Sequence, residues 1–106
     1  MDCIFCKIIN KELPSDIVYE DDEFIVFKDI KPFAPVHLLL VPKIHIGSVN
    51  DLEKKHRELI IGLVLLAKKI ARDHDIFDGY KLSFNVGRKG GQLIDHLHLH
   101  LMGGWQ

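Results

Sequence analysis

The sequence of 106 residues has almost no net charge, no long apolar segment and only two cysteines. A formal net charge of −1 argues against a general electrostatic grip on nucleic acid, although a single nucleotide can still bind. No run of about 18 apolar residues is present, so the sequence predicts no membrane span. The N-terminus has no basic region followed by an apolar stretch, and we therefore expect a cytoplasmic protein without a secretory signal.

Internal repeats, low-complexity tracts and linkers are also missing from the sequence. Its length suits one compact domain with a real core, so we predict a single domain over residues 1–106. Because thiols stay reduced in the cytoplasm, Cys3 and Cys6 are better explained as metal ligands or free thiols than as a disulfide.

Three histidines alternate with three leucines in residues 96–101, which read HLHLHL. Successive side chains of a strand point to opposite faces, so this segment predicts an imidazole face opposite a leucine face. Such a row of imidazoles can bind metal or phosphate, or perform nucleophilic and acid–base chemistry. The simpler interpretation is an incidental or metal-binding cluster. Three histidines on one face, preceded by Gly90-Gly91-Gln92, favour chemistry.

The remaining pattern predicts an α+β fold. Alternation and turn residues predict strands at 16–20, 24–30, 37–41 and 80–86, the first two forming a hairpin. Helical spacing predicts a short helix within residues 3–11 and a long helix from about Asp51 to Asp73, with Asn50 as its N-cap. With the histidine segment as the last strand, the sheet has five largely antiparallel strands and the long helix lies between the third and fourth.

The long helix carries more apolar residues than packing on one sheet requires, because Ile61, Val64 and Leu65 widen its core stripe. One interpretation is a deeply buried helix. The other is a second apolar face that docks on another subunit. The small interior of a chain of this size favours the homodimer.

Two further motifs bear on binding. Cys3-x-x-Cys6 has a spacing common in zinc sites but needs two more ligands, and its alternative is two small buried apolar side chains. Glycines before the histidines let main-chain N–H groups approach an anion, although without the histidines an ordinary flexible turn would be the preferred explanation. Nearby, Asn85 and Gln92 can hydrogen-bond a phosphoryl oxygen without adding charge.

Together these motifs resemble the histidine triad (HIT) family, whose pattern of His-x-His-x-His followed by apolar residues reads HLHLHLM here. The segments CIFCKII…ELPS, FKDIKPFAPVHLLLVPKIH and NVGRKGGQ resemble its Hint branch in the same order, so the similarity covers nearly the whole chain. The resemblance implies a HIT-like fold and a hydrolase or transferase. Its implied reaction cleaves the bond to the α-phosphate of a purine nucleoside 5′-phosphoramidate or related conjugate. A nucleotidyl-histidine intermediate then releases a nucleoside monophosphate.

The resemblance also implies residue roles. His98 matches the nucleophile, His100 the contact to the α-phosphate oxygens, His96 a residue that orients the nucleophile, and His37 a fourth active-site histidine. The other implied contacts to the nucleotide are the ribose ligand Asp29, the base slot of Phe5, Ile8, Phe27, Ile30 and Leu39, and the phosphate or leaving-group contacts Asn85, Gly91 and Gln92.

The resemblance further implies a structural zinc ion, since prokaryotic members often bind zinc at positions matching Cys3, Cys6, His45 and His96. One position differs, because Leu93 stands where many Hint proteins have a serine. Three alternatives to the phosphoramidase remain open at this point. They are a nucleotide-binding regulatory protein with incidental hydrolysis, a dinucleoside polyphosphate hydrolase and a small zinc-binding interaction module.

Overall fold

The computed structural model describes residues 3–106, so the first two residues of the predicted domain lie outside it. The helices are α1 (Ile4–Ile9) and α2 (Arg57–Asp73), with short 3-10 helices η1 (Val49–Asp51), η2 (Lys54–His56) and η3 (Arg88–Gly90). The strands are β1 (Ile17–Glu20), β2 (Phe24–Lys28), β3 (Val36–Pro42), β4 (Tyr80–Ser83) and β5 (Leu99–Gly103). No helix in this part of the chain is long and apolar enough to cross a bilayer.

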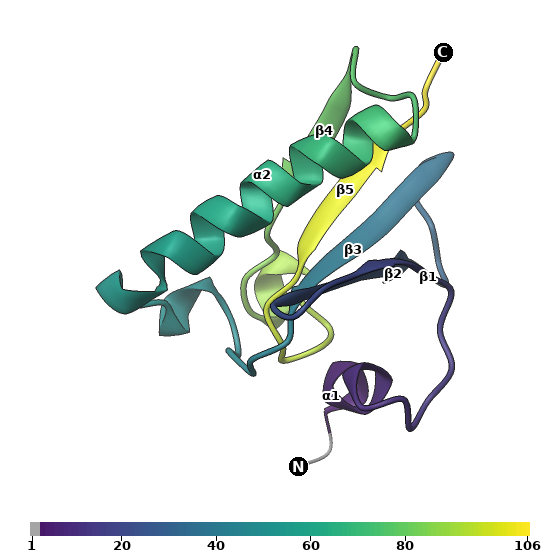
Figure 1. Ribbon diagram of the computed structural model, residues 1–106. Helices are drawn as coiled ribbons and strands as arrows, with labels where there is room; N and C mark the ends of the chain where they lie inside the picture. Colours follow the sequence, from purple (N-terminus) through teal and green to yellow (C-terminus); the bar gives the residue numbers. More distant parts are fainter. Residues whose placement is uncertain (1–2) are drawn as a thin grey trace.

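The five strands form one sheet in the order β1-β2-β3-β5-β4, and every neighbouring pair is antiparallel. The helix α2 covers one side of the sheet and α1 lies on the other (Figure 1). The predicted fold class is therefore confirmed, including the position of the long helix between the third and fourth strands.

Alternation along β3 divides the core into two layers. Leu38 and Leu40 pack with Leu99 and Leu101 of β5 in the layer under α2. Leu39 lies in the layer under α1, because the side-chain direction alternates along a strand. Since β3 is central and both of its faces are covered, its unbroken apolar run is buried on both sides.

Several predicted boundaries are wrong. The long helix begins at Arg57, because Ser48 starts a separate 3-10 turn: its hydroxyl accepts from the Asn50 N–H at 3.1 Å, and its own N–H donates to Asp51 at 3.0 Å. The first cap is therefore Ser48 and not Asn50. The strand β2 ends at Lys28, because the chain turns at Asp29, whose carboxylate accepts the Lys31 N–H.

The histidine segment is only partly a strand. β5 begins at Leu99, and the Leu97 N–H donates to the Ile46 carbonyl at 2.6 Å, beyond the end of β3. β4 also ends before the predicted residue 86, because its last paired residue is Ser83, opposite His100.

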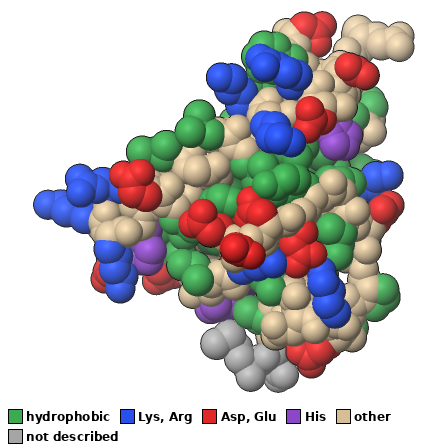
Figure 2. All heavy atoms as spheres, in the orientation of Figure 1, with side chains coloured by type: hydrophobic (Ala, Val, Ile, Leu, Met, Phe, Trp, Pro, Cys, Tyr) green, Lys and Arg blue, Asp and Glu red, His purple; other side chains and the backbone are tan. Residues whose placement is uncertain are grey.

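The outward side of α2 is apolar. Ile61 and Leu65 are 54% and 57% exposed and Val64 is also exposed, so these side chains are not part of the core of one chain. Figure 2 shows hydrophobic side chains at the surface on the side of the molecule that carries α2. A helix buried on all sides is therefore the wrong interpretation for this single chain.

Candidate active site

The histidines of β3 and β5 meet on the α1 side of the sheet. The antiparallel register pairs His37 with Met102 and Leu39 with His100, which makes His37 and His100 diagonal neighbours on one face. Their Nε2 and Nδ1 atoms lie 2.9 Å apart. The ring of His98 is centred 5.0 Å from that of His100, and Phe5 of α1 packs edge-on against His98.

The three imidazoles of HLHLHL do not stay together. His96 turns its Nδ1 atom toward the two cysteine sulfurs, whereas His98 lies beside His100, which in turn contacts His37. The row therefore divides into a Cys/His cluster and a three-histidine cluster, with His96 and His98 separated in sequence only by Leu97. Alternation alone predicts one continuous row.

His98 has one nitrogen fixed and the other free for chemistry. Its Nδ1 lies 2.7 Å from the carbonyl oxygen of His96. A carbonyl only accepts, so Nδ1 carries the proton and Nε2 presents a lone pair. Burial lowers the pKa of His98, against smaller opposing effects of the hydrogen bond to the His96 carbonyl and of the Asp29 charge. A buried neutral imidazole of fixed tautomer, whose Nε2 has no hydrogen-bond partner among residues 3–106, is able to act as a nucleophile.

The surroundings of His100 favour its neutral form more strongly than those of His98 do. Burial lowers its pKa to about 4, with smaller contributions from His98 and His37, while the charge of Asp29 opposes the shift. Its Nε2 atom is buried and has no hydrogen-bond partner within residues 3–106. An unsatisfied buried donor or acceptor is costly, so such an atom in a site of this kind indicates a ligand contact.

This pKa predicts that His100 makes stability depend on pH. The unfolded residue binds a proton near its ordinary pKa of about 6.5 but the folded residue only near 4, so the unfolded chain binds more protons between these values. The stabilisation is present above pH 6.5 and is lost as the pH falls toward 4. We expect the share due to His100 to fall by about 2 kcal/mol between pH 7 and pH 5.

Urea unfolding of the wild type and of His100→Gln at several pH values measures this share, because other titrating groups cancel in the difference. The free energy of unfolding should fall less steeply with acidification in His100→Gln. Parallel curves for the two proteins would contradict the assignment.

Of the residues expected to contact the nucleoside, most lie together. Phe5, Ile8, Phe27 and Leu39 are buried in one apolar layer beside α1. Ile30 lies apart from them, 90% exposed on the loop between β2 and β3. On the same loop, Asp29 keeps one carboxylate oxygen 3.4 Å from His37 Nε2, which places a charge beside the histidines.

The side chain of Gln92 holds the glycine-containing loop of residues 87–91 in place. This side chain is 2% exposed, and its Nε2 donates to the carbonyls of Gly47 and Ile94 while its Oε1 accepts the Gly87 N–H. Both amide donors are therefore used within the protein. Gly91 has a φ of +90°, which favours glycine, and a Cβ there would lie 3.5 Å from the amide nitrogen of Asn85.

The second cluster has the composition and the geometry of a metal site. The donor atoms of Cys3, Cys6, His45 and His96 all lie within 4.8 Å of one another. His96 Nδ1 is 3.3 Å from Cys3 Sγ and 3.2 Å from His45 Nδ1, and Cys6 Sγ is 3.5 Å from His45 Nδ1. Tetrahedral zinc with ordinary Zn–S and Zn–N bonds separates its ligand atoms by about 3.3–3.8 Å.

The tautomer of His96 and the raised pKa of Cys6 also bear on whether this Cys/His cluster binds a cation. His96, which is fully buried, places Nε2 2.7 Å from the Pro42 carbonyl, so the proton lies on Nε2 and the Nδ1 lone pair faces the cysteines. Burial and the neighbouring Cys3 raise the pKa of Cys6 to about 11, so a cation is needed to hold its thiolate at neutral pH. The donor set therefore fits zinc.

Main-chain groups complete both clusters, and sequence reasoning missed them. The Pro42 carbonyl orients His96, the His96 carbonyl orients His98, and the Phe33 N–H donates to His37 Nδ1 at 3.0 Å. Every residue has these groups, so no sequence signal could have found them.

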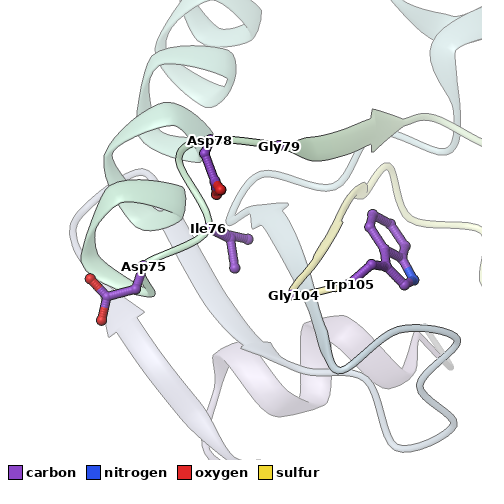
Figure 3. Close-up of a pocket in the computed structure, with 6 residues that line it drawn as sticks. All are labelled: Asp75, Ile76, Asp78, Gly79, Gly104 and Trp105. Carbon is purple, nitrogen blue, oxygen red and sulfur yellow. The ribbon is translucent and has the colours of Figure 1, made fainter.

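A cavity of about 440 Å³ is lined by Asp75, Ile76, Asp78, Gly79, Gly104 and Trp105 (Figure 3). None of the histidines lines it, so it belongs to neither cluster. A second cavity of about 360 Å³ includes Cys3, His45 and the largely exposed Leu93 in its lining, and it borders the proposed metal ligands.

Comparisons with known proteins agree with this arrangement. The family described as "Scavenger mRNA decapping enzyme C-term binding" matches residues 2–104. The chain is 48% identical to Protein HitA of Neisseria gonorrhoeae, over 95% of this chain and 94% of HitA. It is also 48% identical to the purine nucleoside phosphoramidase of Escherichia coli, over 95% and 86% of the two chains. A HIT family hydrolase from Legionella pneumophila superposes with a TM-score of 0.97 at 45% identity, covering 99% of this chain and 95% of that one.

Proposed function

The chain belongs to the histidine triad family of nucleotide-binding hydrolases, and we propose that it hydrolyses purine nucleoside 5′-phosphoramidates or related nucleotide conjugates. The observation that carries this proposal is the arrangement of His98, whose Nδ1–H is fixed on the His96 carbonyl while its Nε2 is free. The relative from Escherichia coli named purine nucleoside phosphoramidase supports the substrate class.

The proposed reaction has two steps. In the first, His98 Nε2 attacks the α-phosphorus, and the bond from phosphorus to the leaving group breaks with its electron pair on the leaving group. In the second, water attacks the phosphorus of the nucleotidyl-histidine, and the bond from phosphorus to Nε2 breaks with its electron pair on Nε2. The water oxygen stays on the nucleoside monophosphate, the released proton goes to solvent, and the neutral imidazole is restored. The leaving amine takes a proton from solvent, because Leu93 offers none in this position.

The other residues bind and orient in this proposal. His100 Nε2, which lacks a partner in the described residues, donates to an α-phosphate oxygen, and Asp29 accepts from the ribose hydroxyls. Asn85 and Gly91 lie at the phosphate, and Gln92 acts by holding the loop that carries Gly91. The apolar residues Phe5, Ile8, Phe27, Ile30 and Leu39 are the proposed surroundings of the base.

The test is hydrolysis of adenosine 5′-phosphoramidate by the purified wild-type protein, with AMP release followed by chromatography. Dinucleoside polyphosphates and nucleotide sugars in the same panel separate the alternative activities. We expect the highest kcat/KM on the phosphoramidate. No turnover above the uncatalysed rate would contradict an enzymatic role, and preferred cleavage of a dinucleoside polyphosphate would replace the substrate class.

We also propose that Cys3, Cys6, His45 and His96 bind zinc in a structural role. The support is the Cys2His2 donor set, with donor atoms spaced as in a tetrahedral site. All four positions are protein ligands, which leaves no open position for a substrate. Reduced thiols suit the cytoplasm, which is the compartment we propose for the protein.

The exposed apolar face of α2 leads us to propose a homodimer through α2 and the β4 edge of the sheet, where Leu82 is also exposed. Light scattering at micromolar concentration should give about twice the chain mass of 12.2 kDa. Leu65→Asp should give the monomer mass, because it places a charge in the buried interface. Leu13→Asp, at an exposed apolar residue away from α2, is the control and should remain dimeric. A monomeric wild type would end this proposal.

A further inference from the structure

One main-chain amide in the loop between β2 and β3 points at an active-site ring. The Phe33 N–H donates to His37 Nδ1 at 3.0 Å. Because a main-chain N–H can only donate, Nδ1 of this buried histidine carries no proton. The imidazole of His37 is therefore neutral, with its single proton on Nε2.

The tautomer of His37 in turn determines the tautomer of His100. His37 Nε2 lies 2.9 Å from His100 Nδ1 and 3.4 Å from an oxygen of Asp29. With its proton on Nε2, His37 donates to His100 Nδ1, and the carboxylate of Asp29 stabilises the proton in this position. His100 Nδ1 is then an acceptor, so the proton of a neutral His100 lies on Nε2. That is the buried atom without a partner in the described part of the chain.

We propose that the main-chain N–H of Phe33 is a positioning group that acts through His37 and fixes His100 as an Nε2–H donor. The identity of the group that accepts from His100, an α-phosphate oxygen, rests on the proposed function. The opposite tautomer would turn a lone pair of His100 toward the anionic oxygen and would repel it. A single main-chain hydrogen bond therefore decides whether His100 attracts or repels the phosphoryl group.

The loop is built to present this amide. Pro32 and Pro35 restrict the backbone on either side of Phe33. At the base of the loop, the Asp29 N–H donates to the His37 carbonyl at 3.1 Å. The Phe33 ring is 83% exposed, and its centroid lies 6.1 Å from that of His37. An aromatic ring has no N–H to donate to Nδ1, so the main-chain amide and not the side chain fixes the tautomer.

A second metal site is the competing interpretation, because the donor atoms of Asp29, His37 and His100 lie within 4.8 Å of one another. A metal on His37 Nε2 would require a neutral His37 to carry its proton on Nδ1. That proton would face the Phe33 N–H, whose nitrogen is only 3.0 Å away. The hydrogen bond from Phe33 therefore favours a proton between the two histidines over a metal ion.

The experiment reads the tautomers directly. Two-bond ¹H–¹⁵N correlation spectra of the full chain with ¹⁵N-labelled histidine should show the Nε2–H form for both His37 and His100. Replacing Phe33 by phenyllactic acid changes its amide to an ester and removes only the N–H. In this protein we expect mixed tautomers at both rings and a kcat on adenosine 5′-phosphoramidate about 10-fold lower, because the phosphate donor is populated less.

Two controls make the result specific. Phe33→Ala keeps the N–H and should show the wild-type tautomers. The same ester exchange at Asp22, an exposed turn residue, should leave tautomers and kcat unchanged. His37→Phe removes the donor to His100 by another route, so His100 should lose its preference for Nε2–H even if the ester protein does not fold.

Each outcome of these experiments either supports or contradicts the proposed role of the Phe33 N–H. A wild-type His37 or His100 with its proton on Nδ1 overturns the proposal, and so does an ester protein with wild-type tautomers. Unchanged His100 tautomers in His37→Phe also overturn it. If the tautomers are as expected but adenosine 5′-phosphoramidate is not hydrolysed, the proposed function fails while the role of Phe33 stands.

Discussion

His98→Ala is expected to lower the kcat on adenosine 5′-phosphoramidate by about a thousandfold or more, because it removes the atom that forms the bond to phosphorus. The fold should survive, since the substitution removes one hydrogen bond to the His96 carbonyl and the edge-on contact with Phe5. The measurement is steady-state AMP release, with circular dichroism to confirm folding. His74→Ala, at the C-terminal end of α2, is the matched control and should keep wild-type activity.

His98→Ala should lose catalysis while it keeps the binding of the nucleotide. Because His100 and Asp29 remain in place, His98→Ala should bind AMP with nearly the wild-type affinity in calorimetry. Rapid quenching of the wild type during turnover should give a peptide containing His98 that carries the mass of the nucleotidyl group. Substantial turnover by purified His98→Ala, or the nucleotidyl group on another residue, would remove His98 from the role of nucleophile.

The second large effect concerns the metal site. Protein purified without chelator should contain about one zinc ion per chain, and His45→Ala should lose it. Structural zinc contributes on the order of 10 kcal/mol in small zinc-finger peptides. Even a third of that would lower the Tm by more than about 10 °C in a domain of this size. Metal analysis and thermal unfolding with and without chelator measure both quantities.

His45 is the informative ligand to replace, because it is exposed and its loss leaves no cavity in the core. His74→Ala again serves as the control. It should keep the zinc and lose only the few degrees of Tm expected from removing the hydrogen bond between its Nδ1 and the Ile70 carbonyl. We also expect a lower kcat in His45→Ala, since His96 joins the metal cluster to the carbonyl that orients His98. Protein without stoichiometric zinc, or with a Tm that chelator does not change, would refute the structural role.

Much of the architecture follows from local patterns in the sequence. The alternation in HLHLHL and the apolar run of β3 assign side chains to the two sides of the sheet, and Leu99 and Leu101 lie in the core as expected. These predictions succeed because the period of a strand depends only on its own backbone. Element ends were less accurate, since they depend on partners elsewhere: β2 ends at Lys28, where the Asp29 carboxylate accepts the Lys31 N–H and the chain turns.

The chemistry of the histidines depends on tertiary structure. The sequence by itself determined that five imidazoles, two cysteines and a carboxylate are available, and it predicted most of the strands and turns near which they lie. Only the folded chain divided the histidines between two clusters, brought His37 beside His100 through the register of β3 and β5, and aimed main-chain groups at their nitrogens. The physical reason is that a tautomer is set by the hydrogen-bond partner of each ring nitrogen. Here those partners are main-chain atoms that every residue possesses and only the fold positions.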